Sequence, residues 1–228
     1  EAERVAAAKK VEEFQSNCQI VAKTCNDNID KLNDLNVQAR QNIMNDSFNE
    51  LQRYINREYS KAQIDILKII DYNLDQLTKC NNTIIDRGFQ ETYTQLLGLI
   101  KETRAESEKI VQLGHIHPLF IKDDKDKSGN INAKFVPYDI TGTNVRYINR
   151  DKYIEKDKKY IFLERQKTGG NWQVVVYKGN SKSSGKVYLR FNCSKEPPQE
   201  CESVQVYKPN FFGAPLLYTG PVTIKTMS

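Results

Sequence analysis

The chain has 228 residues, of which 39% are hydrophobic and 28% are charged, and its formal net charge is +5. This length allows one large domain or two modest ones, each with its own hydrophobic core. Aromatic residues make up 10% of the chain, too many for wholesale disorder. No apolar run approaches the roughly 18 residues that a membrane-spanning helix needs, which excludes such a helix. The chain opens at Glu1 without a Met and without a signal peptide, a start that is compatible with a segment of a longer protein and does not decide whether residues precede it.

The sequence changes character between Gly114 and Pro118. All seven prolines and eight of the eleven glycines lie after Gly114, and these residues favour turns over long helices. Residues 1–114 carry 15 Lys and Arg against 18 Asp and Glu, a net charge of −3. Residues 115–228 carry 19 against 11, a net charge of +8. We therefore predict an α-helical domain over 1–114 and a β-rich domain over 115–228.

The first half has apolar residues at three- and four-residue steps, the period of an amphipathic helix. Its first stripe has a polar residue, Asn28, at one seam position and otherwise comprises Val11, Phe14, Cys18, Val21, Cys25, Leu32, Leu35 and Ala39. Capping patterns at Ser47 with Glu50, and at Thr83 with Asp86, predict that two further helices begin there. Three such helices would bury their stripes against one another as an antiparallel bundle.

The second half predicts short strands separated by turn clusters. The eight candidates recur every 10 to 15 residues: Leu119–Lys122, Lys134–Ile140, Val145–Asn149, Tyr160–Arg165, Trp172–Lys178, Lys186–Asn192, Val204–Lys208 and Pro221–Lys225. Such spacing is typical of an antiparallel sandwich or barrel of seven or eight strands. The predicted fold class is therefore α+β, a helical bundle followed by an all-β domain.

Five cysteines bear on the compartment. Cys18 and Cys25 are seven residues apart, so a helix places both on one seam, and Cys80 could bridge to either across an antiparallel hairpin. Cys193 and Cys201 flank a turn stiffened by two prolines, and a disulfide between them would cross-link the two strands of a hairpin. The alternative is five reduced cysteines in a cytosolic protein, but the pair at adjacent strand ends favours an oxidised, secreted chain.

Two motifs point weakly to ligands. The segment 124–132 resembles the first nine positions of an EF-hand calcium loop, with oxygen donors at Asp124, Asp126, Ser128, Asn130 and Asn132. Phe135 stands where the closing Glu should be and the flanks predict strands, so a polar turn is the competing interpretation. The only histidines, His115 and His117, have no third metal ligand at a recognisable spacing. We expect no metal and no cofactor.

Catalytic and modification motifs give little evidence of function in this sequence. With two histidines there are few places for a Ser–His or Cys–His pair, and neither G-x-S-x-G nor H-E-x-x-H occurs. We therefore expect a protein that is not an enzyme. Asn-x-Ser/Thr sequons lie at Asn45, Asn81 and Asn192, so the chain could be a glycoprotein, although an Asn-rich chain of this length gives about two by chance.

The second half interleaves its 19 Lys and Arg with tyrosines. A basic, aromatic-rich sheet can attract polyanions and stack flat groups on exposed rings. The densest basic positions are Lys152, Lys156, Lys158, Lys159, Lys178, Lys182, Lys186 and Arg190. The competing interpretation is a solvated surface over a Tyr and Phe core.

The layout as a whole resembles one family. A helical half with Cys18, Cys25 and Cys80, followed by a Lys/Tyr/Asn-rich β half with the segment from Cys193 to Cys201, is similar to the labrum-interacting salivary proteins of the 34-kDa group of Aedes mosquitoes. The resemblance spans the chain and rests on layout and composition. It implies a secreted, non-enzymatic saliva protein that binds a cuticular protein of the mouthparts and modulates probing and biting. No family binding motif maps onto residues of this chain.

From these observations we expect a secreted, extracellular protein that binds a protein partner, without a membrane span. The alternative is a module that binds glycosaminoglycan, another sulfated glycan or nucleic acid through the basic β domain. Nucleic acid is the less expected polyanion if the chain is secreted.

Overall fold

The computed structural model describes residues 2–44, 50–84, 86–122, 133–149, 159–166, 170–178, 186–191, 204–209, 215–220 and 223–226. It divides into two compact units, Glu1–Asn42 with Tyr54–Gly114, and Ile43–Arg53 with His115–Ser228. Along the chain, the first unit ends at Gly114 and the second continues from His115. Residues 43–53, which the prediction placed in the helical domain, group with the sheet.

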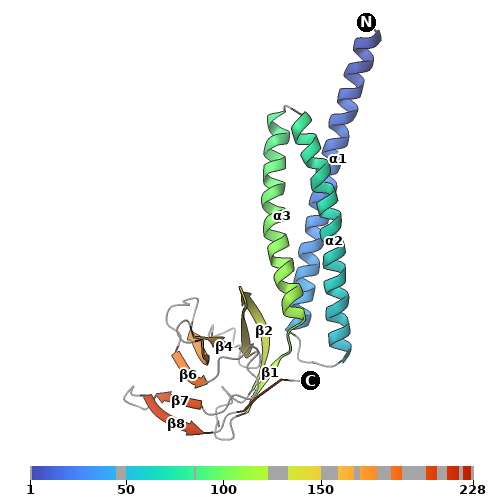
Figure 1. The fold of residues 1–228 in the computed structure, drawn as a ribbon. Helices are drawn as coiled ribbons and strands as arrows, with labels where there is room; N and C mark the ends of the chain where they lie inside the picture. The colour runs from blue at the N-terminus through green and yellow to red at the C-terminus, as the bar shows by residue number, and fades with distance from the viewer. Residues whose placement is uncertain are drawn as a thin grey trace. The chain divides into compact units, whose positions relative to one another are not determined.

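The helical unit is built from three helices, α1 (Ala2–Ile43), α2 (Glu50–Thr83) and α3 (Arg87–Gly114) (Figure 1). Their apolar stripes form one core cluster that includes Cys18, Cys25, Leu32, Ile70 and Leu77, each at most 1% exposed. The predicted seam residue Asn28 is also buried. The stripes therefore bury one face of each helix, as the periodicity predicted. No described helix is long and apolar enough to cross a membrane.

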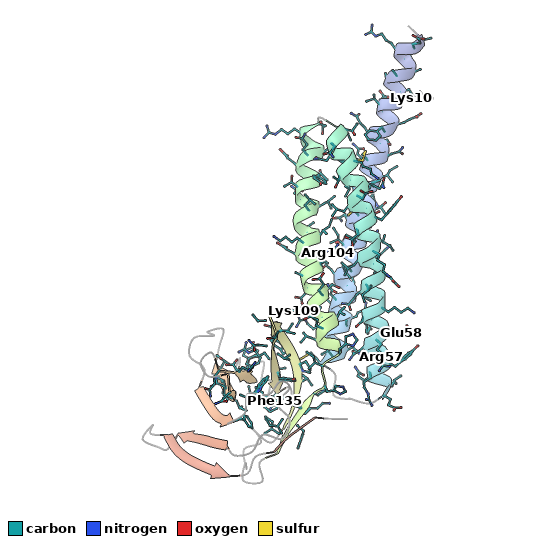
Figure 2. The ribbon with its side chains drawn as sticks, viewed as in Figure 1. Lys10, Arg57, Glu58, Arg104, Lys109 and Phe135 are labelled. Carbon is teal, nitrogen blue, oxygen red and sulfur yellow. A yellow bond between two sulfur atoms is a disulfide. The ribbon has the colours of Figure 1, made fainter. Side chains whose placement is uncertain are left out.

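The first four turns of α1 project past the other two helices (Figure 1). Residues 2–17 are all exposed, and Lys10 in Figure 2 marks this part. Val11 and Phe14, which the stripe predicted as core residues, are 56% and 38% exposed. That prediction was wrong because the stripe continues along α1 beyond the point where α2 and α3 cover it.

The structure corrects one of the two helix starts that the capping patterns predicted. Thr83 does not begin a helix: it is the last residue of α2, and its hydroxyl donates to the carbonyl of Lys79. Asp86 is the N-cap of α3 instead, because its Oδ1 accepts the backbone N–H of Phe89 at 2.9 Å. The α2 helix begins at Glu50, and Ser47 lies outside the described residues.

The second unit contains one antiparallel sheet, in which the described strands run in the order β8-β7-β6-β5-β4-β3-β2-β1-β9. The bounds are β1 Leu119–Lys122, β2 Ala133–Thr141, β3 Asn144–Asn149, β4 Lys159–Arg165, β5 Trp172–Lys178, β6 Lys186–Phe191, β7 Val204–Pro209, β8 Pro215–Gly220 and β9 Thr223–Thr226. This confirms the α+β class.

Two details of the sheet go beyond the prediction. The nine described strands belong to one curled antiparallel sheet, which fits the barrel alternative of the prediction (Figure 1). The prediction also missed β8, which begins at Pro215 and ends at Gly220. Turn-forming residues at both ends hid this short strand, and Pro is tolerated there because β8 is an edge strand and Pro is its first residue.

Alternation along the strands separates two faces of the sheet. Backbone register places Tyr147 opposite Leu163, and Leu163 opposite Val174, so these residues share one face with Phe135 and Trp172. All five are at most 1% exposed, and Phe135 is labelled in Figure 2. The curled sheet therefore encloses its apolar core on this face.

Candidate binding surface

Aromatic and charged side chains gather on the opposite face of β2–β5. Register pairs Ile148 with Phe162 and Tyr160 with Tyr177, which puts these residues on the face away from Trp172. We call the following six residues the aromatic face: Tyr138, Arg146, Tyr160, Phe162, Glu164 and Tyr177. Five of them are half-buried, while Phe162 is 6% exposed and lies in a small cluster with Val136 and Ile148.

Phe162 is the centre of the aromatic face. The rings of Tyr138 and Tyr177 approach it edge-on or tilted, with centroids at 5.4 and 5.7 Å, and Tyr160 stacks nearly parallel at 6.1 Å. These are the distances at which aromatic rings attract one another. Three strands thus supply one continuous aromatic patch, whose tyrosines combine an apolar ring with a polar hydroxyl.

Arg146 lies over this patch. The Cζ atom of Arg146 is 3.7 Å from the centroid of Phe162 and 5.1 Å from that of Tyr177, both within cation–π range. The Nε atom of Arg146 lies 2.8 Å from Oε2 of Glu164 on the neighbouring strand, with side chains only 21% and 18% exposed. The guanidinium therefore lies over the ring next to a carboxylate that balances its charge, an ion pair by distance in which the Nε–H is not aligned for a hydrogen bond.

Glu164 also accepts a hydrogen bond of 2.7 Å from the hydroxyl of Tyr177. Burial raises the pKa of Tyr177 to about 12, and the hydrogen bond and charge of Glu164 act in the same direction, against the smaller opposing effect of Arg146. The phenol therefore stays protonated and remains a donor at neutral pH. Arg146, Glu164 and Tyr177 form one preorganised polar group inside the aromatic patch.

The sequence indicated only part of this surface. Tyrosines between basic residues were predicted only as a composition, and Arg146, Phe162 and Glu164 were missed. Arg146 and Glu164 are 18 positions apart, and only the pairing of β3 with β4 brings them together. No local motif signals such a contact.

The predicted basic positions are partly brought together by the backbone. Lys159 pairs with Lys178 between β4 and β5, and Lys186 pairs with Val176 between β5 and β6. These three positions therefore lie at one end of three neighbouring strands. Arg190 pairs with Gln173 at the other end. Lys152, Lys156, Lys158 and Lys182 lie outside the described residues.

The structure contains a disulfide between Cys18 and Cys80, with Cα atoms 5.8 Å apart. This confirms a bridge from Cys80 and selects Cys18 over Cys25, which is a free, buried thiol. Burial raises the pKa of the Cys25 thiol, so it is poorly reactive. Cys193 and Cys201 lie outside the described residues, and their pairing stays a prediction.

The other predicted positions contribute little to a site. Within the ranges that the structure describes, no three His, Cys, Asp or Glu are arranged to hold a metal ion, and His115 and His117 are exposed. The calcium-loop residues Asp124, Asp126, Ser128, Asn130 and Asn132 lie outside those ranges. So do the sequons at Asn45 and Asn192, while Asn81 lies in α2 with its carboxamide oxygen buried, a poor setting for glycosylation.

A hollow of about 520 Å³ lies on the helical unit between α1 and α3. Two of its charged lining residues already have structural partners: Lys23 pairs with Asp27 at 3.0 Å, and Asp86 caps α3. The hollow therefore offers less preorganised chemistry than the aromatic face.

Comparison of the chain with protein-family models, with curated proteins and with solved structures finds no match.

Proposed function

We propose that this chain is a non-enzymatic, extracellular binding protein that holds a protein partner on its aromatic face. The observation that carries the proposal is Arg146 stacked on Phe162 between tyrosines from three strands. Tyr and Arg are enriched among the residues that dominate binding energy at protein interfaces. They lose little conformational entropy on binding when neighbouring groups already hold them in place, as Glu164 does here.

The disulfide supports the extracellular part of the proposal. Disulfides persist in oxidising compartments and are rare in the reducing cytosol. The Cys18–Cys80 bond links two segments 62 residues apart in the helical unit. The resemblance to mosquito salivary proteins adds a specific candidate partner, a cuticular protein of the mouthparts, and this stays a proposal.

The test compares two double variants in the same binding assay. Tyr160→Ala/Tyr177→Ala removes two rings from the aromatic face, whereas Tyr54→Ala/Tyr72→Ala removes two rings that are 60% and 66% exposed on α2. Crosslinking to a cuticular extract identifies the bound protein, and its purified form is then titrated against each variant. We expect the first variant to weaken binding at least about tenfold and the second to leave it unchanged. Equal binding by both variants, with unchanged circular dichroism, would exclude the aromatic face.

A second candidate function is polyanion binding, favoured by the common strand end of Lys159, Lys178 and Lys186. Affinity for heparin would then fall steeply with salt, because binding releases counterions. Changing these three lysines to Gln should lower the slope of log affinity against log salt by about two to three. The matched control changes Lys31, Lys61 and Lys101, which are exposed on the helices. If both triple variants behave alike, general positive charge is the cause and this strand end is not a site.

A further inference from the structure

Among the described residues, a disulfide and two side-chain hydrogen bonds between α1 and α2 report the same register. They are the Cys18–Cys80 disulfide, the hydrogen bond of 2.7 Å from Nε2 of Gln63 to Oδ1 of Asn36, and the bond of 2.6 Å from Nδ2 of Asn42 to Oδ1 of Asn56. The residue numbers in the three pairs add to 98, 99 and 98. Antiparallel helices in one register keep this sum constant along their length, and a slip by one heptad would change it by seven.

A second register of α2 against α1 would also bring two cysteines into position for a disulfide. Cys25 lies seven residues after Cys18 on the same buried seam, so sliding α2 by one heptad would bring Cys80 opposite Cys25. A shift of seven residues leaves apolar stripes facing each other, because seven residues are close to two helical turns. The apolar core alone therefore discriminates poorly between the two disulfides.

The connection between the helices does not prevent this slip either. The shifted register would place Glu50 about 12 residues past the end of α1, roughly 18 Å along the axis and about 10 Å across. The seven links from Ile43 to Glu50 can span roughly 24 Å when extended. The choice of cysteine must therefore come from side chains that favour one register.

Buried amide side chains favour the native register over the shifted one. Asn36 and Gln63 are 4% and 0% exposed, and Asn56 is 7% exposed. After the slip, Asn36 would face the buried Ile70, and Asn56 would lie beyond Ile43, where α1 ends. A single new pair, Asn42 with Gln63, would replace the two existing pairs. Asn36 would then be a buried amide without a hydrogen bond, which is strongly unfavourable.

We infer that the buried Asn36–Gln63 pair and the half-buried Asn42–Asn56 pair set the register of α1 against α2 and thereby direct Cys80 to Cys18 instead of Cys25. Even the native Asn36–Gln63 pair leaves Nδ2 of Asn36 and Oε1 of Gln63 without a hydrogen bond among the described atoms. An apolar pair would avoid that cost. Buried polar residues that specify register at the expense of stability are well known in coiled coils.

The register set by the amide pairs also keeps the Cys25 thiol away from the disulfide. For exchange, the Cys25 thiolate would attack the sulfur of Cys80, form the Cys25–Cys80 bond and release Cys18 as a thiolate, with no net oxidation. In the native register Cys25 is two helical turns, about 10 Å, from the Cys18 position. Exchange therefore requires the slip that the amide pairs oppose.

The test is the pattern of disulfides formed on refolding. The full chain carrying Cys193→Ser/Cys201→Ser is reduced, refolded with reduced and oxidised glutathione, which accepts the two electrons, and mapped by peptide mass spectrometry. We expect Cys18–Cys80 alone in this background. Adding Asn36→Leu/Gln63→Leu should raise the fraction of Cys25–Cys80 at least about tenfold. The matched control, Asn33→Leu/Asn82→Leu, changes exposed amides on the same two helices and should not change the pattern.

A reciprocal variant keeps the inference falsifiable if the leucine variant does not fold. Asn36→Gln/Gln63→Asn restores an amide pair at the same layer and should give Cys18–Cys80 alone. Selection of Cys18 by the folded leucine variant, or a mixture of bonds in the folded reciprocal variant, would show that the register is set elsewhere. If both fail to fold, Asn42→Leu/Asn56→Leu is mapped in the same way, and Cys18–Cys80 alone would overturn the inference.

Discussion

The two units differ in where they bury polar groups. Nine of the ten buried polar residues that the structure describes lie on the three helices, and the tenth is Asn149 in the sheet. A strand shifted by one residue turns its whole apolar face to water, so alternation excludes every odd-numbered slip in the sheet. A helix shifted by one heptad keeps its apolar face buried, so the bundle needs polar contacts to specify its register.

The two units also use tyrosine differently. Tyr54 and Tyr72 lie singly on α2 and are 60% and 66% exposed, whereas the sheet gathers Tyr138, Tyr160 and Tyr177 around Phe162. Scattered surface aromatics need no explanation, but a contiguous patch marks an interaction site. This difference is what supports the proposal that the sheet, and not the bundle, carries the binding surface.

The largest effect should come from the core of the sheet. Trp172 is fully buried and its ring lies 5.9 Å from that of Tyr147. We expect Trp172→Ala to lower the free energy of unfolding of the sheet by about 3–5 kcal/mol, since it removes a large apolar side chain and leaves a cavity. Eight of the twelve tyrosines lie after Gly114, so near-ultraviolet circular dichroism would report mainly the second unit, while the far-ultraviolet helical signal reports the bundle. Loss of both signals in one shifted transition would contradict the separation of the two units.

A comparable but smaller effect should follow from removing the disulfide. Cys18→Ser/Cys80→Ser opens a loop with a sequence separation of 62, which should lower the free energy of unfolding by about 4 kcal/mol on the chain-entropy relation, and by less if the reduced chain retains structure. Thermal unfolding of the helical signal, with and without reductant, measures this. Reductant should destabilise the parent protein and leave the variant unchanged. Equal sensitivity of both proteins to reductant would assign the effect to other cysteines.

The smallest effect should depend on pH and belongs to the aromatic face. The pKa of Tyr177 is raised to about 12 from an ordinary value of about 10, so the protonated phenol favours the folded state. Its contribution should be complete below pH 10 and should disappear as the pH rises through about 12. We expect Tyr177→Phe to lower the free energy of unfolding by about 1 kcal/mol at neutral pH, a value discounted for partial exposure, and to match the parent protein above that range. Denaturant unfolding across this pH range tests it, with Tyr72→Phe as the control. A constant difference at all pH values would show that the hydroxyl does not act through its ionisation.

Local patterns predicted most elements of the fold. Leu119–Lys122 and Trp172–Lys178 were placed correctly to the residue, and the other six predicted strands overlap observed ones within one or two residues at each end, because alternation and turn residues are local signals. The strand β8 was not predicted, because turn-forming residues stand at both of its ends. The exposed Val11 and Phe14 show the limit of a stripe: it identifies which face of a helix can be buried, but not where the partner helices end.

By itself, the sequence determined the class of each half, the position along the chain where the helices give way to strands, and the seam on which Cys18 and Cys25 lie. These properties follow from periodicity and turn chemistry, which act over a few residues. Tertiary structure alone decided that Cys80 bonds Cys18, and that Arg146 and Glu164 meet over Phe162. Both outcomes depend on how segments far apart in the chain align, and alignment is set by pairing and packing that no local pattern encodes.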